Sequence, residues 1–130
     1  MASAETALAA ALSADAGFAA QADGRIFPAG GRQGVTYPYA TYQRISTTGA
    51  KFLDGASNLD WPRFQIDSWG RTALEAIALA EAIRAAIDNV TIAGDPRITA
   101  TFQDQSGPAP DEETRNFRVS QDYLIFHERS

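Results

Sequence analysis

Apolar residues recur with helical spacing in two segments of the chain. In the first, Ser3 is a suitable N-cap and Leu8 and Leu12 share one stripe, which predicts a helix that ends near Ala14. The second follows a capping box and reads "ALEAIALAEAIRAAID", residues 73–88, made of strong helix formers. The capping box consists of Thr72 and Glu75. The apolar face of this helix consists of Ala76, Leu79, Ala80, Ile83, Ala86 and Ile87. Both helices are expected to cover a sheet.

Alternation of apolar and polar residues predicts strands in much of the remaining chain. "YATYQRIS" alternates and is rich in aromatic and β-branched residues, and Pro62 opens a strand in which Phe64 and Ile66 point inward. The predicted strands with the clearest alternation are residues 25–27, 39–46, 62–69, 98–102 and 115–128. The stretches "AGGRQGVTY", "LDGASN" and "DQSGPAPDEET" are predicted loops because glycine, proline and small polar residues dominate them.

The order of the elements predicts the fold class. One helix, three strands, a second helix and three further strands are expected to form a mixed sheet whose strands pair mainly antiparallel. The last two strands form a long C-terminal β-hairpin, and the two helices pack on one face. Because 130 residues fit one domain, the prediction is a single α+β domain spanning residues 1–130.

The charge balance narrows the choice of partners. Sixteen acidic and eleven basic residues give a formal net charge of −5, so the surface has no basic excess for binding phosphates. The chain contains no cysteine, which rules out disulfides and thiolate metal sites. Its first twenty residues include Glu5 and Asp15 and lack a basic start, so neither a signal peptide nor a membrane span is predicted.

None of the polar clusters matches a catalytic, cofactor or metal site. His127 has no cysteine or serine arrangement beside it, which favours a structural or surface role. "GGRQG" lacks the Gly-Lys-Ser/Thr ending of a phosphate loop. Asp111, Glu112 and Glu113 are adjacent carboxylates in a proline-rich stretch, which favours a solvated loop over a calcium site. The protein is therefore predicted to be no enzyme and to need no cofactor.

The two tryptophans of the chain stand close to two arginines in one short segment. These residues are Trp61, Arg63, Trp69 and Arg71. Trp69 shares a strand face with Arg63, whereas Phe64 points to the opposite, inward face. Aromatic residues and arginine are enriched at the buried centres of protein contacts. We therefore predict that the four residues belong to a subunit or partner interface.

Five short motifs then follow one another in a fixed order. They are "GRIFP" at 24–28, "YPYATYQRIS" at 37–46, "LDG" at 53–55, "FQIDSWGRT" at 64–72 and "ALAEAIRAAI" at 78–87. In this order and spacing the chain resembles the tail completion proteins of long-tailed phages and phage-like gene transfer particles, from about Leu8 to Ile87. The resemblance implies a structural virion protein, similar to tail terminators and tail-to-head joining proteins.

The resemblance also implies partners and a place of action. Such proteins form a ring, usually of six copies, that caps the finished tail tube and docks it to the head-side connector. The implied partners are further copies of the chain, the tail tube protein and a connector or stopper protein of the head. DNA passes through the ring without specific binding, and no membrane is involved. The protein is expected in the virion, at the head–tail interface, after assembly in the bacterial host cytoplasm.

A closed ring requires two different contact patches on each subunit. We expect the second patch in the C-terminal hairpin or in the loop at residues 30–35. An acidic lumen would repel DNA phosphate. The candidates for the lumen or its rim are Asp104, Asp111, Glu112 and Glu113. Alternatively, this acidic loop faces the head and inserts into the connector.

Two other functions remain open from the sequence. The first is a head-completion stopper or connector protein, which shares the size and the α/β content but binds on the portal side. The second is a small ligand-binding accessory domain, in which Trp61, Tyr42 and Trp69 would line an apolar pocket.

Overall fold

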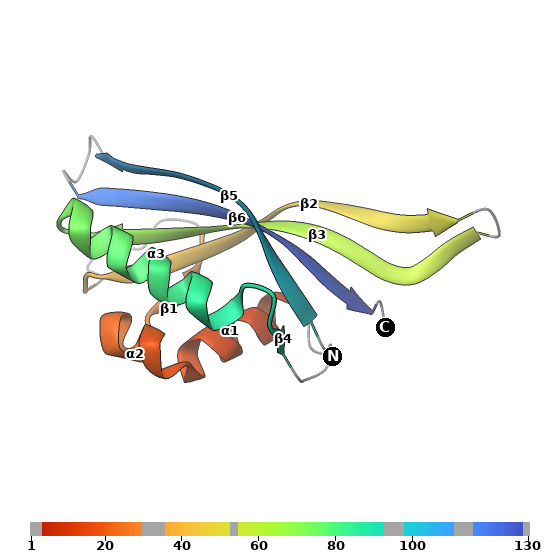
Figure 1. Ribbon diagram of the computed structural model, residues 1–130, viewed down its shortest axis with the longest axis horizontal. Coiled ribbons are helices and arrows are strands. Elements are labelled where there is room, and N and C mark those ends of the chain that lie inside the picture. Colours follow the sequence, from red (N-terminus) through yellow and green to blue (C-terminus); the bar gives the residue numbers. More distant parts are fainter. Residues whose placement is uncertain (1–3, 30–35, 53–54, 93–97, 111–115, 129–130) are drawn as a thin grey trace.

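The computed structural model describes residues 4–29, 36–52, 55–92, 98–110 and 116–128. For residues 46–61 and 126–128 it describes the backbone alone. Within these residues the chain forms three helices and six strands (Figure 1). Ser3, the predicted cap of the first helix, lies outside them.

The two predicted helices are both present, as α1 (Ala4–Ala14) and α3 (Ala73–Ile87). At the start of α3, Thr72 Oγ1 accepts a hydrogen bond from the Glu75 backbone N–H at 3.1 Å, as the capping box predicts. Glu75 Oε1 in turn accepts from the Arg71 backbone N–H at 2.8 Å, one residue before the cap. Two unpaired N–H groups at the helix entry are thereby satisfied.

A third helix, α2 (Ala16–Ala22), was not predicted, so the expectation of two helices is wrong. Asp15 is its N-cap and accepts at Oδ2 from the Phe18 backbone N–H at 2.9 Å. Asp23 ends it with a left-handed φ of 50°. A helix of two turns is too short to show a clear apolar period, and burial of Phe18 against the core holds it in place.

The strands form one six-stranded mixed sheet with the order β1-β2-β3-β6-β5-β4. Their bounds are β1 (Ile26–Pro28), β2 (Tyr39–Phe52), β3 (Gly55–Gly70), β4 (Thr91–Ile92), β5 (Ile98–Pro110) and β6 (Phe117–Glu128). β1 runs parallel to β2, and the other neighbouring strands are antiparallel. The predicted α+β class, the mainly antiparallel sheet and the C-terminal hairpin of β5 and β6 are confirmed.

Several strands are longer than predicted. β2 continues to Phe52 and β3 begins at Gly55, so the prediction of a loop at "LDGASN" is wrong for residues 55–58. β5 continues to Pro110, which makes residues 104–110 of the predicted "DQSGPAPDEET" loop part of a strand. Register shifts within β2 and β5 accommodate the glycines and prolines at which a sequence-based criterion ends a strand.

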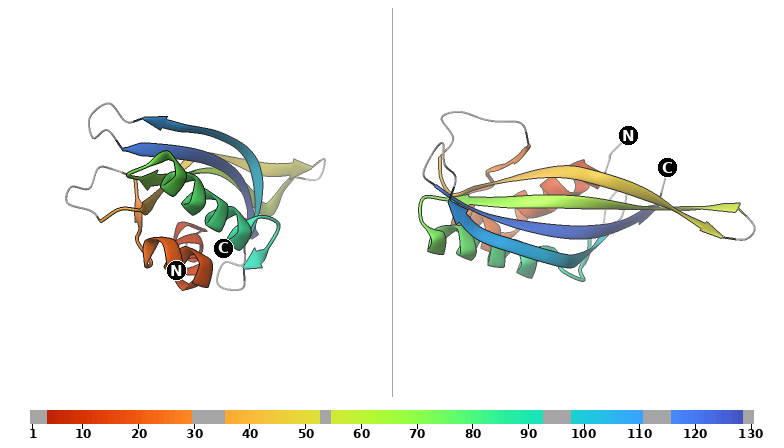
Figure 2. Two further views of the ribbon diagram at one scale, coloured as in Figure 1. Left: turned by 60° about the vertical axis from the view of Figure 1, so that its left-hand side comes forward. Right: turned by 90° about the horizontal axis from the view of Figure 1, so that it is seen from above.

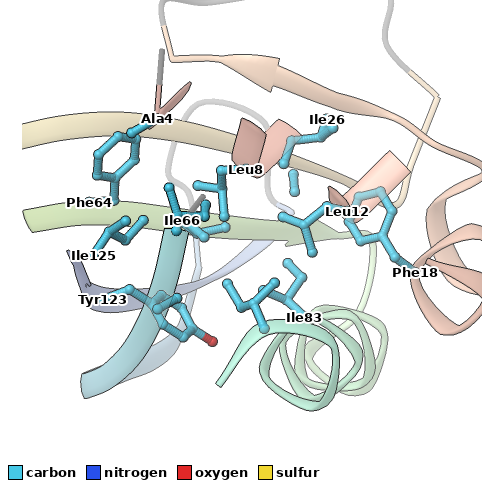
Figure 3. Close-up of a cluster of buried hydrophobic side chains, with 14 of the residues drawn as sticks. Ala4, Leu8, Leu12, Phe18, Ile26, Phe64, Ile66, Ile83, Tyr123 and Ile125 are labelled. Atoms are coloured by element: carbon cyan, nitrogen blue, oxygen red, sulfur yellow. The ribbon is translucent and has the colours of Figure 1, made fainter. Parts of the chain in front are cut away.

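All three helices lie on one side of the sheet, and the core fills the space between the two layers (Figure 1). Figure 3 shows side chains from α1, α2 and α3 meeting those of β3 and β6. The labelled core residues are Ala4, Leu8, Leu12, Phe18, Ile26, Phe64, Ile66, Ile83, Tyr123 and Ile125. Burying one large apolar side chain contributes about 1.5–3 kcal/mol, so this layer accounts for much of the stability.

The β2–β3 hairpin projects past the other strands (Figures 1 and 2). The pairing of β3 with β6 ends at Leu59, opposite Glu128. Beyond it, residues 50–52 and 55–58 form a two-stranded extension, which we call the hairpin arm. A two-stranded ribbon alone is marginally stable in water.

Candidate interaction surface

The side of the sheet opposite the helices, here called the uncovered face, carries no helix or strand among the described residues (Figure 1). Its side chains alternate along the strands with the core residues. The cross-strand register arranges them in three rows: Tyr39, Trp69 and Arg118; then Thr41, Asp67, Ser120 and Ser106; then Gln43, Gln65, Asp122 and Asp104. Aromatic and basic groups therefore lie at one end of this face and acidic groups further along it.

Trp69 lies on the uncovered face, as the alternation along β3 predicts, but it is half-buried and not exposed. Its ring stacks on that of Tyr39, with centroids 5.9 Å apart and an interplanar angle of 8°. The indole Nε1 donates to Thr41 Oγ1 at 3.1 Å, and the Arg118 guanidinium lies 5.5 Å from the ring centroid. Part of the Trp69 ring therefore packs against its neighbours on the uncovered face, and the rest of the ring is accessible.

Two further residues extend this stack towards the start of α3. Tyr37 meets Tyr39 edge to face, with centroids 5.0 Å apart, and the Arg71 guanidinium lies 5.8 Å from the centroid of Tyr37. We call Tyr37, Tyr39, Trp69, Arg71 and Arg118 the aromatic–arginine cluster. Both arginines are exposed, and no carboxylate of the described residues forms a salt bridge with either. Their guanidinium donors are available to a partner.

The structure brings together two of the four predicted interface residues. Trp69 and Arg71 belong to the aromatic–arginine cluster, whereas Arg63 is exposed six positions earlier on β3, about 20 Å away at ~3.3 Å per residue. The side chain of Trp61 lies outside the described residues. Sequence reasoning missed Arg118, because only the β3–β6 register places it beside Trp69.

The acidic side chains gather in the middle of the uncovered face. Asp104 is exposed and pairs across the strands with Asp122, which in turn lies opposite Gln65. Gln65 Nε2 donates to both carboxylate oxygens of Asp67, at 3.0 and 3.2 Å. The predicted lumen residues 111–113 lie outside the described part of the chain. Within the described part, no group of three potential metal ligands is found.

A buried polar network lies under the sheet, on the helix side. Gln121 is fully buried, and its Nε2 donates to Ala80 O at 3.1 Å and to Gln105 Oε1 at 3.0 Å. The Tyr123 hydroxyl donates to Gln121 Oε1 at 3.2 Å. Burial, with a smaller effect of the Asp88 charge, raises the pKa of Tyr123, so the hydroxyl keeps its proton. The network joins β5, β6 and α3.

Among the described residues, no helix is both long enough and apolar enough to span a bilayer. The side chain of His127 lies outside the described part, so its predicted structural or surface role stays a prediction.

A comparison with protein families covers nearly the whole chain. Residues 6–128 match the model of the family described as tail completion protein gp17. The chain belongs to this family. It is therefore a structural tail completion protein, a component of the virion, and the resemblance carried by the five motifs is confirmed. The match also includes the C-terminal hairpin, which lies beyond the motifs.

Comparison with solved structures supports the fold of this tail completion protein. A chain from the virion of a native gene transfer agent particle matches with a TM-score of 0.80 over 96% of this chain and 94% of that chain. The two sequences are 19% identical, so the likeness shows a shared fold. No curated protein matches the sequence.

Proposed function

We propose that this tail completion protein forms a closed ring, a hexamer, that terminates the tail tube and joins the tail to the head-side connector. Membership of the tail completion family supports a role at the tail end. The observation that carries the proposal is the uncovered face of the sheet, which has an aromatic–arginine cluster at one end and acidic residues in its middle. The role is structural and involves no catalysed reaction.

The aromatic–arginine cluster is the proposed contact with a protein partner. Arg71 and Arg118 form no salt bridge with a described carboxylate, and Trp69 presents part of a flat ring between them. These residue types supply most of the binding energy in many protein interfaces. The predicted interface residues Trp61 and Arg63, at the other end of the strand segment, remain part of the proposal as contacts of a neighbouring subunit.

The acidic residues of the uncovered face are the proposed border of the DNA path. Asp104 and Asp122 are cross-strand neighbours there, and Asp111, Glu112 and Glu113 continue the acidic sequence after β5. A lumen lined with negative charge lowers the attraction of phosphates and lets DNA slide. The alternative placement of this segment is the head-facing rim of the ring, inserted into the connector.

The experiment is negative-stain microscopy of particles from a producing strain that lacks the gene. DNA-filled heads beside free tails of uncontrolled length are expected. Empty or leaking heads would instead assign the protein to the head-completion stopper class. Normal joined particles would refute both roles.

Complementation with variants tests the contact surface itself. The double variant Arg71→Ala and Arg118→Ala is expected to restore at least tenfold fewer joined particles than the wild type, because arginine is enriched among the few interface residues whose truncation costs about 2 kcal/mol or more. Glu81→Ala, an exposed change on the helix side, is the matched control and is expected to complement fully. Full complementation by the double variant would remove the cluster from the interface.

A further inference from the structure

Neither arginine of the aromatic–arginine cluster forms a salt bridge with a carboxylate of the described residues. We infer that the cluster binds an acidic segment of a different virion protein, whose carboxylates pair with the Arg71 and Arg118 guanidiniums. The inference rests on the function proposed above, which makes the cluster a partner contact, and it specifies the chemistry of that partner. The segment brings neighbouring acidic side chains to this end of the uncovered face.

The two acidic residues closest to Arg71 in the sequence bind other groups. Glu75 Oε1 accepts from the Arg71 backbone N–H at 2.8 Å, and no salt bridge joins this carboxylate to the guanidinium. Asp67 lies two positions before Trp69 on β3, and both of its carboxylate oxygens accept from Gln65 Nε2. A partner that supplies carboxylates therefore gains charge-assisted hydrogen bonds for which no described residue competes.

The rings of the cluster support both guanidiniums. The Arg118 guanidinium lies 5.5 Å from the ring centroid of Trp69, and that of Arg71 lies 5.8 Å from the centroid of Tyr37. Tyr39 connects the two rings, since it stacks on Trp69 at 5.9 Å and meets Tyr37 edge to face at 5.0 Å. A guanidinium over a ring keeps its forked N–H donors, which match the geometry of a carboxylate. Because the rings already restrict these side chains, binding costs less ordering than it would for unsupported arginines.

The charge further along the same face favours a protein segment over DNA. Asp122 follows Arg118 by four positions on β6, about 13 Å at ~3.3 Å per residue, and pairs across the strands with the exposed Asp104. DNA carries phosphates in an unbroken series, so a duplex bound at the cluster would bring further phosphates towards these carboxylates. The acidic side chains of a protein segment are limited in number. Asp104 and Asp122 repel such a segment from the middle of the face, which fixes its position at the cluster.

The placement of the acidic pair favours a different protein over a second copy of this chain. Asp104 and Asp122 lie on the uncovered face together with the cluster. The acidic pair of one copy therefore reaches the cluster of another only when two uncovered faces meet, as in a twofold dimer. A closed ring instead joins two different patches of each subunit by rotation, and it leaves the proposed border of the DNA path open. The acidic segment is accordingly assigned to another chain of the virion.

Zero-length cross-linking tests the contact, because Lys51 is the one lysine of the chain. In a Lys51→Arg chain, the change Arg118→Lys introduces a single side-chain amine, beside Trp69. Particles from a producing strain are treated with a carbodiimide, which condenses an amine with a carboxylate in direct contact. Mass spectrometry is expected to find the introduced lysine linked to a segment of another virion protein in which acidic residues are neighbours. Glu81→Lys in the same Lys51→Arg chain, an exposed change on the helix side, is the matched control and should not link to that segment.

The inference is overturned if particles that contain the Arg118→Lys chain show no link, or if the link joins it to a second copy of this chain.

A second comparison separates charge from packing and applies even if that chain does not enter particles. Arg71→Lys with Arg118→Lys keeps both charges, whereas Arg71→Gln with Arg118→Gln removes them at similar length. In a strain that lacks the gene, the glutamine pair is expected to restore about tenfold fewer joined particles than the lysine pair. Equal restoration would overturn the inference. Normal joined particles without the gene would refute the proposed function itself.

Discussion

Replacing Tyr123 and Gln121, two side chains of the buried polar network, separately and together tests how β6 is held to α3. The Tyr123 hydroxyl and Gln121 Oε1 are partners at 3.2 Å, and both side chains are fully buried. Because both are buried, neither group can form a replacement hydrogen bond with water when the other is removed. The perturbations are Tyr123→Phe, Gln121→Leu and the double variant.

The expected magnitudes follow from the groups that each change leaves unpaired. Tyr123→Phe removes one donor and leaves Gln121 Oε1 without that hydrogen bond, at a cost of about 1–2 kcal/mol in the free energy of unfolding. Gln121→Leu removes three hydrogen bonds and strands the Tyr123 hydroxyl, at a cost of about 2–3 kcal/mol, while Ala80 O keeps its helical partner. The double variant contains neither the Tyr123 hydroxyl nor Gln121 Oε1, so it leaves neither group unpaired. It should therefore cost about 1 kcal/mol less than the sum of the single changes.

Urea unfolding followed by tryptophan fluorescence gives all four free energies, provided that the denaturant slope stays constant across the series. Tyr37→Phe is the matched control. Its hydroxyl has no hydrogen-bond partner among the described residues, so a change below about 0.5 kcal/mol is expected. Costs of the two single variants that add to within about 0.3 kcal/mol would refute the coupling of Tyr123 and Gln121.

Three simpler changes test local features of the fold by thermal unfolding. Asp15→Ala removes the cap of α2 and is expected to cost about 1 kcal/mol, whereas no loss would show that the helix needs no cap. Gly70→Ala would place a Cβ 2.6 Å from the Ala76 backbone N, so a loss of about 2 kcal/mol or more is expected, and an unchanged midpoint would contradict this close approach. Ser68→Ala is expected to be neutral or to stabilise by up to about 1 kcal/mol, because its buried hydroxyl has no partner in the described structure; a clear loss would reveal one.

Helices α1 and α3 were predictable because each places several apolar residues at regular spacing and has a side chain suited to cap it. Helix α2 was not predictable, because it has only two turns and is stabilised by the burial of Phe18. That burial is a tertiary contact, which a local sequence pattern does not show. The strands were recognised at their alternating centres. Their ends were missed at glycines and prolines, because a neighbouring strand can hold such residues in a bulged ladder.

The candidate surface was predictable only in part for a related reason. The proximity of Trp69 and Arg71 was visible because two positions separate them in the chain. The partners that complete the surface come from other strands: Arg118 is paired with Trp69, and Asp122 with Asp104, by register alone. A single sequence shows which residues share one strand face but not which strand will lie beside it.

The central position of β6 has a consequence for how the chain folds during its synthesis. β3 and β5 have no direct pairing and share a sheet only through β6, the last of the six described strands along the chain. Until residues 117–128 have left the ribosome, the β2–β3 hairpin and the β4–β5 pair are separate ribbons whose inner edges are open. Folding of the sheet is therefore expected to be completed in a late step, when β6 joins the two ribbons through contacts between distant parts of the sequence, and chains that stall before β6 are the ones exposed to aggregation.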